Sequence, residues 1–142
     1  MTSRLITRLC IGLILISTAT SVPAELLFED ARIRQPPPGV GVTAGYVVIR
    51  NTGSTPIELT GAHSSRFARV EMHQTKLEDG VYRMLPQSSL TVPAQGQISL
   101  EPASYHLMLM QLSGDIAPDD RIQIVFTSKD REIPVDFTVF AP

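Results

Sequence analysis

Hydrophobic and polar residues alternate with a period of two along most of this 142-residue chain, a pattern that predicts β-strands. The clearest stretches are residues 45–50, 121–126 and 135–140, which are rich in β-branched and aromatic side chains. Turn-forming sequences divide the chain at residues 51–54, 78–80, 93–96 and 113–115. No long stretch holds the period of an amphipathic helix. Short strands between regularly spaced turns indicate an all-β protein, a Greek-key β-barrel or sandwich.

The first 24 residues follow a different pattern. Arg4 and Arg8 give a basic start, an apolar run covers residues 9–16, and small and polar residues follow as far as Ala24. This layout is typical of a secretory signal peptide. The apolar run is well short of the roughly 20 residues that span a bilayer. We therefore expect a cleaved signal peptide at residues 1–24, one exported domain at residues 25–142, and no stable membrane insertion after cleavage.

Composition excludes several classes of function. The only cysteine, Cys10, lies inside the predicted signal peptide, so the mature chain would have neither a disulfide nor a cysteine-based zinc or redox site. The formal net charge is −2 and no basic cluster is present, which argues against nucleic acid as a partner. The sequence also contains no G-x-S-x-G or H-E-x-x-H motif and no pair of acids placed for catalysis, so we expect no enzyme activity.

Two histidines and two methionines form the candidate chemistry: His73, Met84, His106 and Met108, called here the donor set. Soft thioethers combined with imidazoles suit Cu(I) better than Zn(II) or the hard cations. The donors are uncharged when both imidazoles are neutral, so a bound Cu(I) would leave the site with a charge of plus one. The set contains no thiol that an oxidant could attack. This chemistry suits a copper carrier in an oxidising compartment.

The strand pattern predicts how the donors are presented. Residues 105–110 alternate, so His106, Met108 and Met110 should share one face, and same-face neighbours about 7 Å apart can reach one ion. In the strand at residues 69–74, Glu71 and His73 should share a face, with Val70 and Met72 on the other. The turn at residues 78–80 predicts a hairpin, which would bring Met84 opposite His73 or within a few residues of it.

Structural roles are the alternative for these residue types. Methionine is often core filler because its flexible thioether fits gaps, and we interpret Met72 and Met110 in that way. His63 lies in a polar stretch and is interpreted as a surface or hydrogen-bonded residue. Residue types alone therefore leave open a secreted β-sandwich that binds no metal and acts as an interaction module.

The spacing His73-x10-Met84-x21-His106-x-Met108 resembles the motif of the periplasmic PCu(A)C copper chaperones, written H(M)-x10-M-x21-H-x-M. Flanking and upstream segments are similar too, at residues 30–34, 46–53, 70–73, 83–86 and 105–109. One departure is Ala103-Ser104, where members often carry a glycine. It affects a turn and no ligand position.

The resemblance implies a cupredoxin-like β-barrel that works in the periplasm and binds one Cu(I) through the donor set. It further implies delivery of the ion to apo proteins, chiefly the CuA site of cytochrome c oxidase subunit II. A periplasmic copper buffer or resistance protein without a dedicated acceptor would carry the same motif, and the sequence does not separate these two functions.

Overall fold

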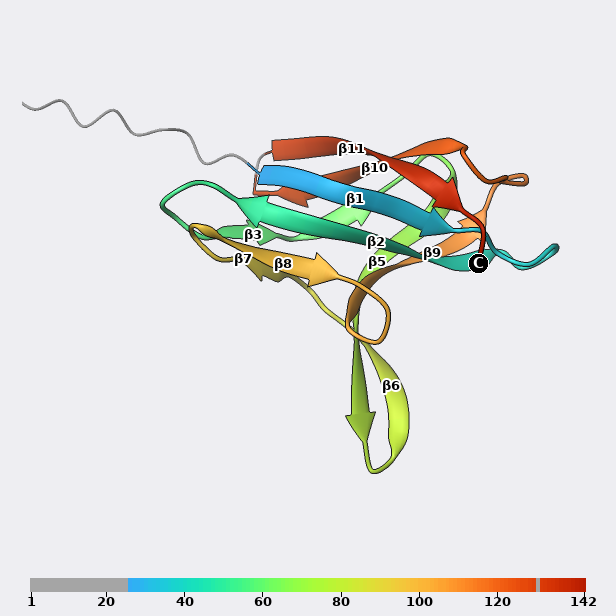
Figure 1. The fold of residues 1–142 in the computed structure, drawn as a ribbon, viewed down its shortest axis with the longest axis horizontal. Coiled ribbons are helices and arrows are strands. Elements are labelled where there is room, and N and C mark those ends of the chain that lie inside the picture. The colour runs from blue at the N-terminus through green and yellow to red at the C-terminus, as the bar shows by residue number, and fades with distance from the viewer. Residues whose placement is uncertain (1–25, 130) are drawn as a thin grey trace, which may run out of the picture.

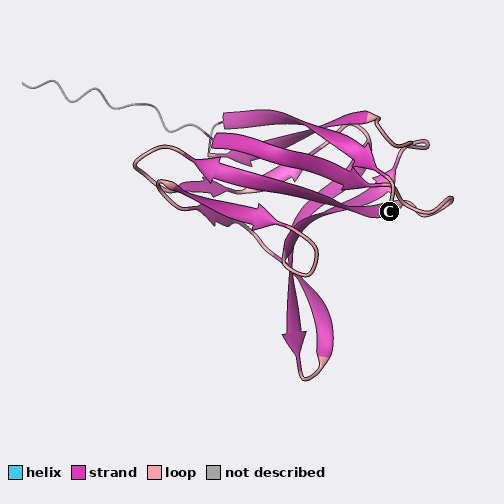
Figure 2. Ribbon diagram, viewed as in Figure 1, coloured by secondary structure: helices cyan, strands magenta, loops and turns pink. Residues whose placement is uncertain are grey.

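The computed structural model describes residues 26–129 and 131–142, which form eleven strands and no helix (Figure 2). The strands in chain order are β1 (Leu26–Arg34), β2 (Val42–Asn51), β3 (Ile57–Leu59), β4 (Gly61–His63), β5 (Phe67–Glu78), β6 (Val81–Pro86), β7 (Leu90–Val92), β8 (Gly96–Leu100), β9 (Tyr105–Leu112), β10 (Arg121–Ser128) and β11 (Arg131–Phe140). The all-β prediction is confirmed. The predicted signal peptide lies outside the described residues. Within those residues, no helix is long and apolar enough to cross a membrane.

Nine strands form one sheet in the order β4-β10-β11-β1-β2-β8-β9-β5-β6, and β3 and β7 pair separately (Figure 1). Most pairs are antiparallel, but β1 runs parallel to β11, and β8 and β9 form one parallel pair, Leu100 with Tyr105, across the short segment that joins them. β4, at one end of the sheet, lies against β5 near the other end. The sheet therefore closes around a single core.

The core is formed by the inward-facing residues, which alternate with outward-facing residues along each strand. On β9, Leu107 and Leu109 are fully buried, as the period of two predicts. Ile122, Ile124 and Phe126 do the same on β10. Each such side chain contributes roughly 1.5–3 kcal/mol when it leaves water. The core holds the strands that carry the donor set at a fixed register.

The β5–β6 hairpin projects from the body of the domain (Figure 1). Its turn places Asp79 and Gly80 at φ values of 51° and 78°, the left-handed pair that a tight two-residue hairpin requires and that an Asp-Gly sequence favours. Leu77 and Tyr82 face each other near the tip and both are exposed. The hairpin predicted from the turn sequence is confirmed, and it carries Met84 on its returning strand.

Candidate metal centre

His73 and His106 lie directly opposite each other on the antiparallel strands β5 and β9. Their ring centroids are 5.8 Å apart with an interplanar angle of 44°. Only 7% of His73 and 5% of His106 is exposed to solvent. The two imidazoles are thus held side by side and largely out of water, a place where polar groups need partners.

His106 has one partner for its ring. Its Nδ1 lies 3.3 Å from the carbonyl oxygen of Ser104, so Nδ1–H donates and Nε2 keeps the lone pair. Burial lowers the pKa of His106 below its ordinary value of 6.5, and His73 adds to this, while the Ser104 hydrogen bond works in the opposite direction. The ring is therefore held in the neutral form that can bind a metal.

His73 is oriented by a carboxylate. Its Nε2 lies 2.8 Å from Oε2 of Glu71, whose Oε1 accepts from the Arg69 guanidinium. The hydrogen bond from His73, followed by that from Arg69, holds the pKa of the Glu71 carboxyl below its ordinary value of 4.5, against a smaller opposing effect of desolvation. The other ring nitrogen of His73, Nδ1, is buried and has no hydrogen-bond partner among the described residues.

The methionines complete the arrangement from two strands. Met108 follows His106 by two residues on β9 and lies opposite Glu71 on β5. Met84, on β6, pairs with Thr75 of β5. Thr75 is the next residue after His73 on the same face of β5, so Met84 lies diagonally across from His73. Long side chains reach across such diagonal positions.

A surface hollow of about 400 Å³ brings three of the donors together, because Met84, His106 and Met108 all line it. Val42 and Tyr46 of β2 are among its other walls. His73 does not line the hollow. It lies next to the other three donors because its ring is beside the ring of His106. Met84 is 59% exposed, so the hollow opens to solvent on the side of the hairpin.

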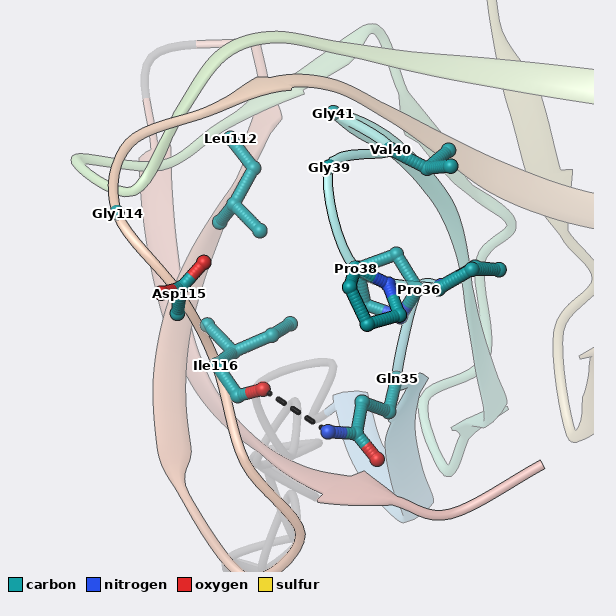
Figure 3. A pocket seen from close by; sticks show the side chains of 11 residues that line it. Gln35, Pro36, Pro38, Gly39, Val40, Gly41, Leu112, Gly114, Asp115 and Ile116 are labelled. Carbon is teal, nitrogen blue, oxygen red and sulfur yellow. Dashed lines mark hydrogen bonds between the residues drawn. The ribbon is translucent and has the colours of Figure 1, made fainter.

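A second hollow, of about 490 Å³, lies between the proline-rich β1–β2 loop and the segment after β9 (Figure 3). Gln35 Nε2 donates a hydrogen bond to the carbonyl of Ile116 there, at 3.2 Å. Its lining includes neither histidine nor methionine. In the described part of the chain, no three His, Cys, Asp or Glu side chains gather in a way that could hold a metal.

The other sequence interpretations are tested by burial. Met72 is 3% exposed and packs in the core, as predicted. Met110 was predicted as core filler, and this is wrong: it is only partly buried and lies on the face of β9 that turns away from Leu107 and Leu109. His63 is an exposed residue with Nε2 3.2 Å from Glu132 Oε1, so its prediction is confirmed.

Sequence reasoning missed the hydrogen-bond partners of the two histidines. Glu71 precedes His73 by two residues, and the predicted alternation already placed both on one face. That spacing was the signal that could have identified Glu71 as a partner. The Ser104 carbonyl left no such signal, because its direction depends on the turn before β9.

Residues 26–139 match a family model described as "Putative lipoprotein LpqE-like". The "Putative lipoprotein Lxx21020" of Leifsonia xyli subsp. xyli is 30% identical over 93 residues, which are 65% of this chain and 56% of that protein. The "Uncharacterized protein RP573" of Rickettsia prowazekii is 27% identical over 92 residues, or 64% of this chain and 51% of that protein. The chain thus spans about half the length of the curated relatives it matches.

Solved PCuAC domains share the fold. The copper-bound PCuAC domain from PmoF2 has a TM-score of 0.70 at 19% identity, and the match covers 87% of this chain and 99% of that domain. The solution structure of CuI-DR1885 from Deinococcus radiodurans has a TM-score of 0.62 at 26% identity, covering 85% of this chain and 80% of that one. These neighbours confirm the predicted fold and the resemblance to PCu(A)C proteins.

Proposed function

Because the chain belongs to the LpqE-like family and folds like the PCu(A)C domains, we propose that it is a periplasmic copper chaperone. It binds one Cu(I) through His73, Met84, His106 and Met108 and delivers the ion to apo acceptor proteins. The structural neighbours include domains described as copper-bound and CuI-bound, which supports the choice of metal.

The observation that carries this proposal is the opposition of His73 and His106 across β5 and β9, next to a hollow lined by Met84 and Met108. The imidazoles are buried and need partners, and the thioethers are soft donors. Cu(I) is the common ion that this mixture suits best, because Zn(II) prefers imidazole, thiolate and carboxylate.

Exposure of the donors explains how the ion can leave. Met84 is 59% exposed, whereas His73 and His106 are nearly covered. An incoming acceptor ligand can therefore replace the Met84 thioether first, while the histidines still hold the copper. Thiolates bind Cu(I) more strongly than thioethers, so transfer of the ion to a cysteine-containing acceptor is thermodynamically favourable. The transfer needs no electron transfer and no catalytic base.

The acceptor is the CuA site of cytochrome c oxidase subunit II, by the resemblance to PCu(A)C chaperones. The periplasmic location is supported by the signal-peptide pattern of residues 1–24 and by the lipoprotein names of the family and of the Leifsonia relative. Secreted or envelope proteins meet an oxidising environment, in which a site free of thiols survives.

The test is transfer of Cu(I) from the loaded protein to a purified apo CuA domain, without oxygen, followed by separation and copper analysis of both proteins. We expect copper to move to the CuA domain. A Met84→Leu variant should lose the ion faster to a competing chelator, while a Tyr82→Ala variant, changed at an exposed neighbour, should behave as wild type. Tight binding without transfer would contradict the chaperone function and leave a copper buffer. No binding would contradict both.

A further inference from the structure

The two histidines of the centre differ in which ring nitrogen is free to bind a metal. In His73 the difference comes from the hydrogen bond to Glu71. We propose that Glu71 is a positioning residue that keeps the hydrogen of His73 on Nε2, so that Nδ1 is the nitrogen presented to copper. This inference rests on the proposed function, since it names the atom by which one of the ligands binds.

The tautomer follows from the hydrogen-bond chemistry. An ionised carboxylate only accepts hydrogen bonds, so the 2.8 Å contact between Glu71 Oε2 and His73 Nε2 requires a hydrogen on Nε2. In the neutral ring Nδ1 then carries the lone pair. That atom is buried and unpartnered among the described residues. A buried acceptor without a donor is unfavourable, and a metal ion is one of the groups that explain such an atom.

The carboxylate itself is held in place and is not free to be a ligand. Arg69 occupies Oε1 of Glu71, and His73 occupies Oε2. Arg69 also favours the ionised form, which keeps Glu71 an acceptor. A hard carboxylate oxygen is in any case a poor partner for Cu(I). Glu71 therefore acts through His73.

His106 is set the other way. The Ser104 carbonyl takes the hydrogen of Nδ1 at 3.3 Å, which leaves Nε2 for the metal. The centre thus presents Nδ1 from β5 and Nε2 from β9, although the two residues are direct cross-strand partners. Partners of this kind fix ring orientation and raise the basicity of the ligand nitrogen, and their loss typically lowers metal affinity by about 10–100-fold.

Long-range ¹H–¹⁵N correlation spectra of histidine-labelled protein test the assignment without activity. In the apo protein we expect the Nε2–H tautomer for His73 and the Nδ1–H tautomer for His106. On addition of one equivalent of Cu(I), a diamagnetic ion, the nitrogens that shift should be Nδ1 of His73 and Nε2 of His106. An apo His73 with its hydrogen on Nδ1, or a copper-induced shift at its Nε2, would overturn the proposal.

The variant arm uses Glu71→Ala, with Glu132→Ala as the matched control, because Glu132 makes an equivalent contact to the exposed His63. Glu71→Ala should mix the tautomers of His73 and lower Cu(I) affinity by about 10–100-fold. Glu132→Ala should leave both unchanged. Unaltered His73 tautomers in a folded Glu71→Ala variant would contradict the positioning role. A wild type that shows the expected apo tautomers but binds no Cu(I) would overturn the proposed function, and with it the metal-binding role of Nδ1.

Discussion

His73 and His106 are direct cross-strand partners on β5 and β9, both buried, and their ring centroids are 5.8 Å apart. Neighbouring positions on the same two strands hold Glu71 and Met108 opposite each other. One face of this strand pair therefore carries two imidazoles, a thioether and a carboxylate in two neighbouring same-face pairs, and the pair between them, Met72 with Leu107, faces the core.

The protein should bind one Cu(I) per chain and far less Zn(II), because thioethers are poor ligands for Zn(II). X-ray absorption at the copper edge should show both sulfur and nitrogen scatterers. A spectrum fitted by nitrogen and oxygen alone would rule out the thioether ligands.

Substitutions inside the donor set should weaken copper binding more than substitutions outside it. His106→Ala or Met108→Ala should lower Cu(I) affinity by more than the roughly 10–100-fold expected when a residue that hydrogen-bonds to a metal ligand is lost. His63→Ala should leave affinity unchanged, because His63 is exposed and pairs with Glu132. Competition with a chromophoric Cu(I) chelator measures each affinity.

Met72→Ala separates packing from binding. Met72 is 3% exposed in the core, so its truncation should lower the free energy of unfolding by about 2–5 kcal/mol. Cu(I) affinity of the folded variant should change little. If Met72→Ala proved more damaging to copper affinity than His106→Ala, the face assignment on β5 would be wrong.

Copper should stabilise the fold, since the donors come from three strands and converge only in the folded chain. Ligand binding restricted to the folded state contributes about 2.7 kcal/mol at a hundredfold excess over Kd. A thermal melt with and without Cu(I), under reductant and without oxygen, should show a rise in Tm. Reductant alone should leave Tm of the mature domain unchanged. An equal rise in a His106→Ala, Met108→Ala double variant would place copper elsewhere.

Ala103 marks a local departure from the family pattern, which often has glycine in this turn. Its φ of 63° lies in the left-handed region, which disfavours side chains with a Cβ. Ala103→Gly should raise the free energy of unfolding by up to about 1 kcal/mol, after the entropy that glycine adds to the unfolded chain. Urea denaturation measures the change, and a loss of stability would contradict the assigned backbone conformation.

Acid should destabilise the apo protein in two steps. The pKa of His106 is lowered in the folded state. As pH falls below about 6.5, the unfolded chain therefore binds a proton more readily than the folded chain, and the free energy of unfolding falls. The lowered pKa of Glu71 has the same sign at more acidic pH, below about 4.5. Tm measured from about pH 8 downwards should show the first step in wild type and lose it in His106→Phe. A wild type that gained stability on acidification would contradict the burial of His106.

Much of the fold and of the donor set follows from the sequence. The period of two predicted the strands that became β2, β9, β10 and β11, and the Asp79-Gly80 turn predicted the hairpin. The spacing of the motif singled out the four residues of the donor set as candidate ligands. These are properties of neighbouring residues, because alternation and turn chemistry act over a few positions.

The tertiary structure alone decided which residues face each other. The register of β5 against β9 puts His106 opposite His73, and no local pattern specifies a pairing between strands so far apart in the chain. The failed prediction for Met110 has another origin: alternation had already placed Met110 on the face of His106 and Met108, opposite the buried Leu107 and Leu109, and the core-filler interpretation rested on residue type alone. The burial of both imidazoles and the unpartnered Nδ1 of His73 likewise arise only when β5, β9 and the turn before β9 pack together.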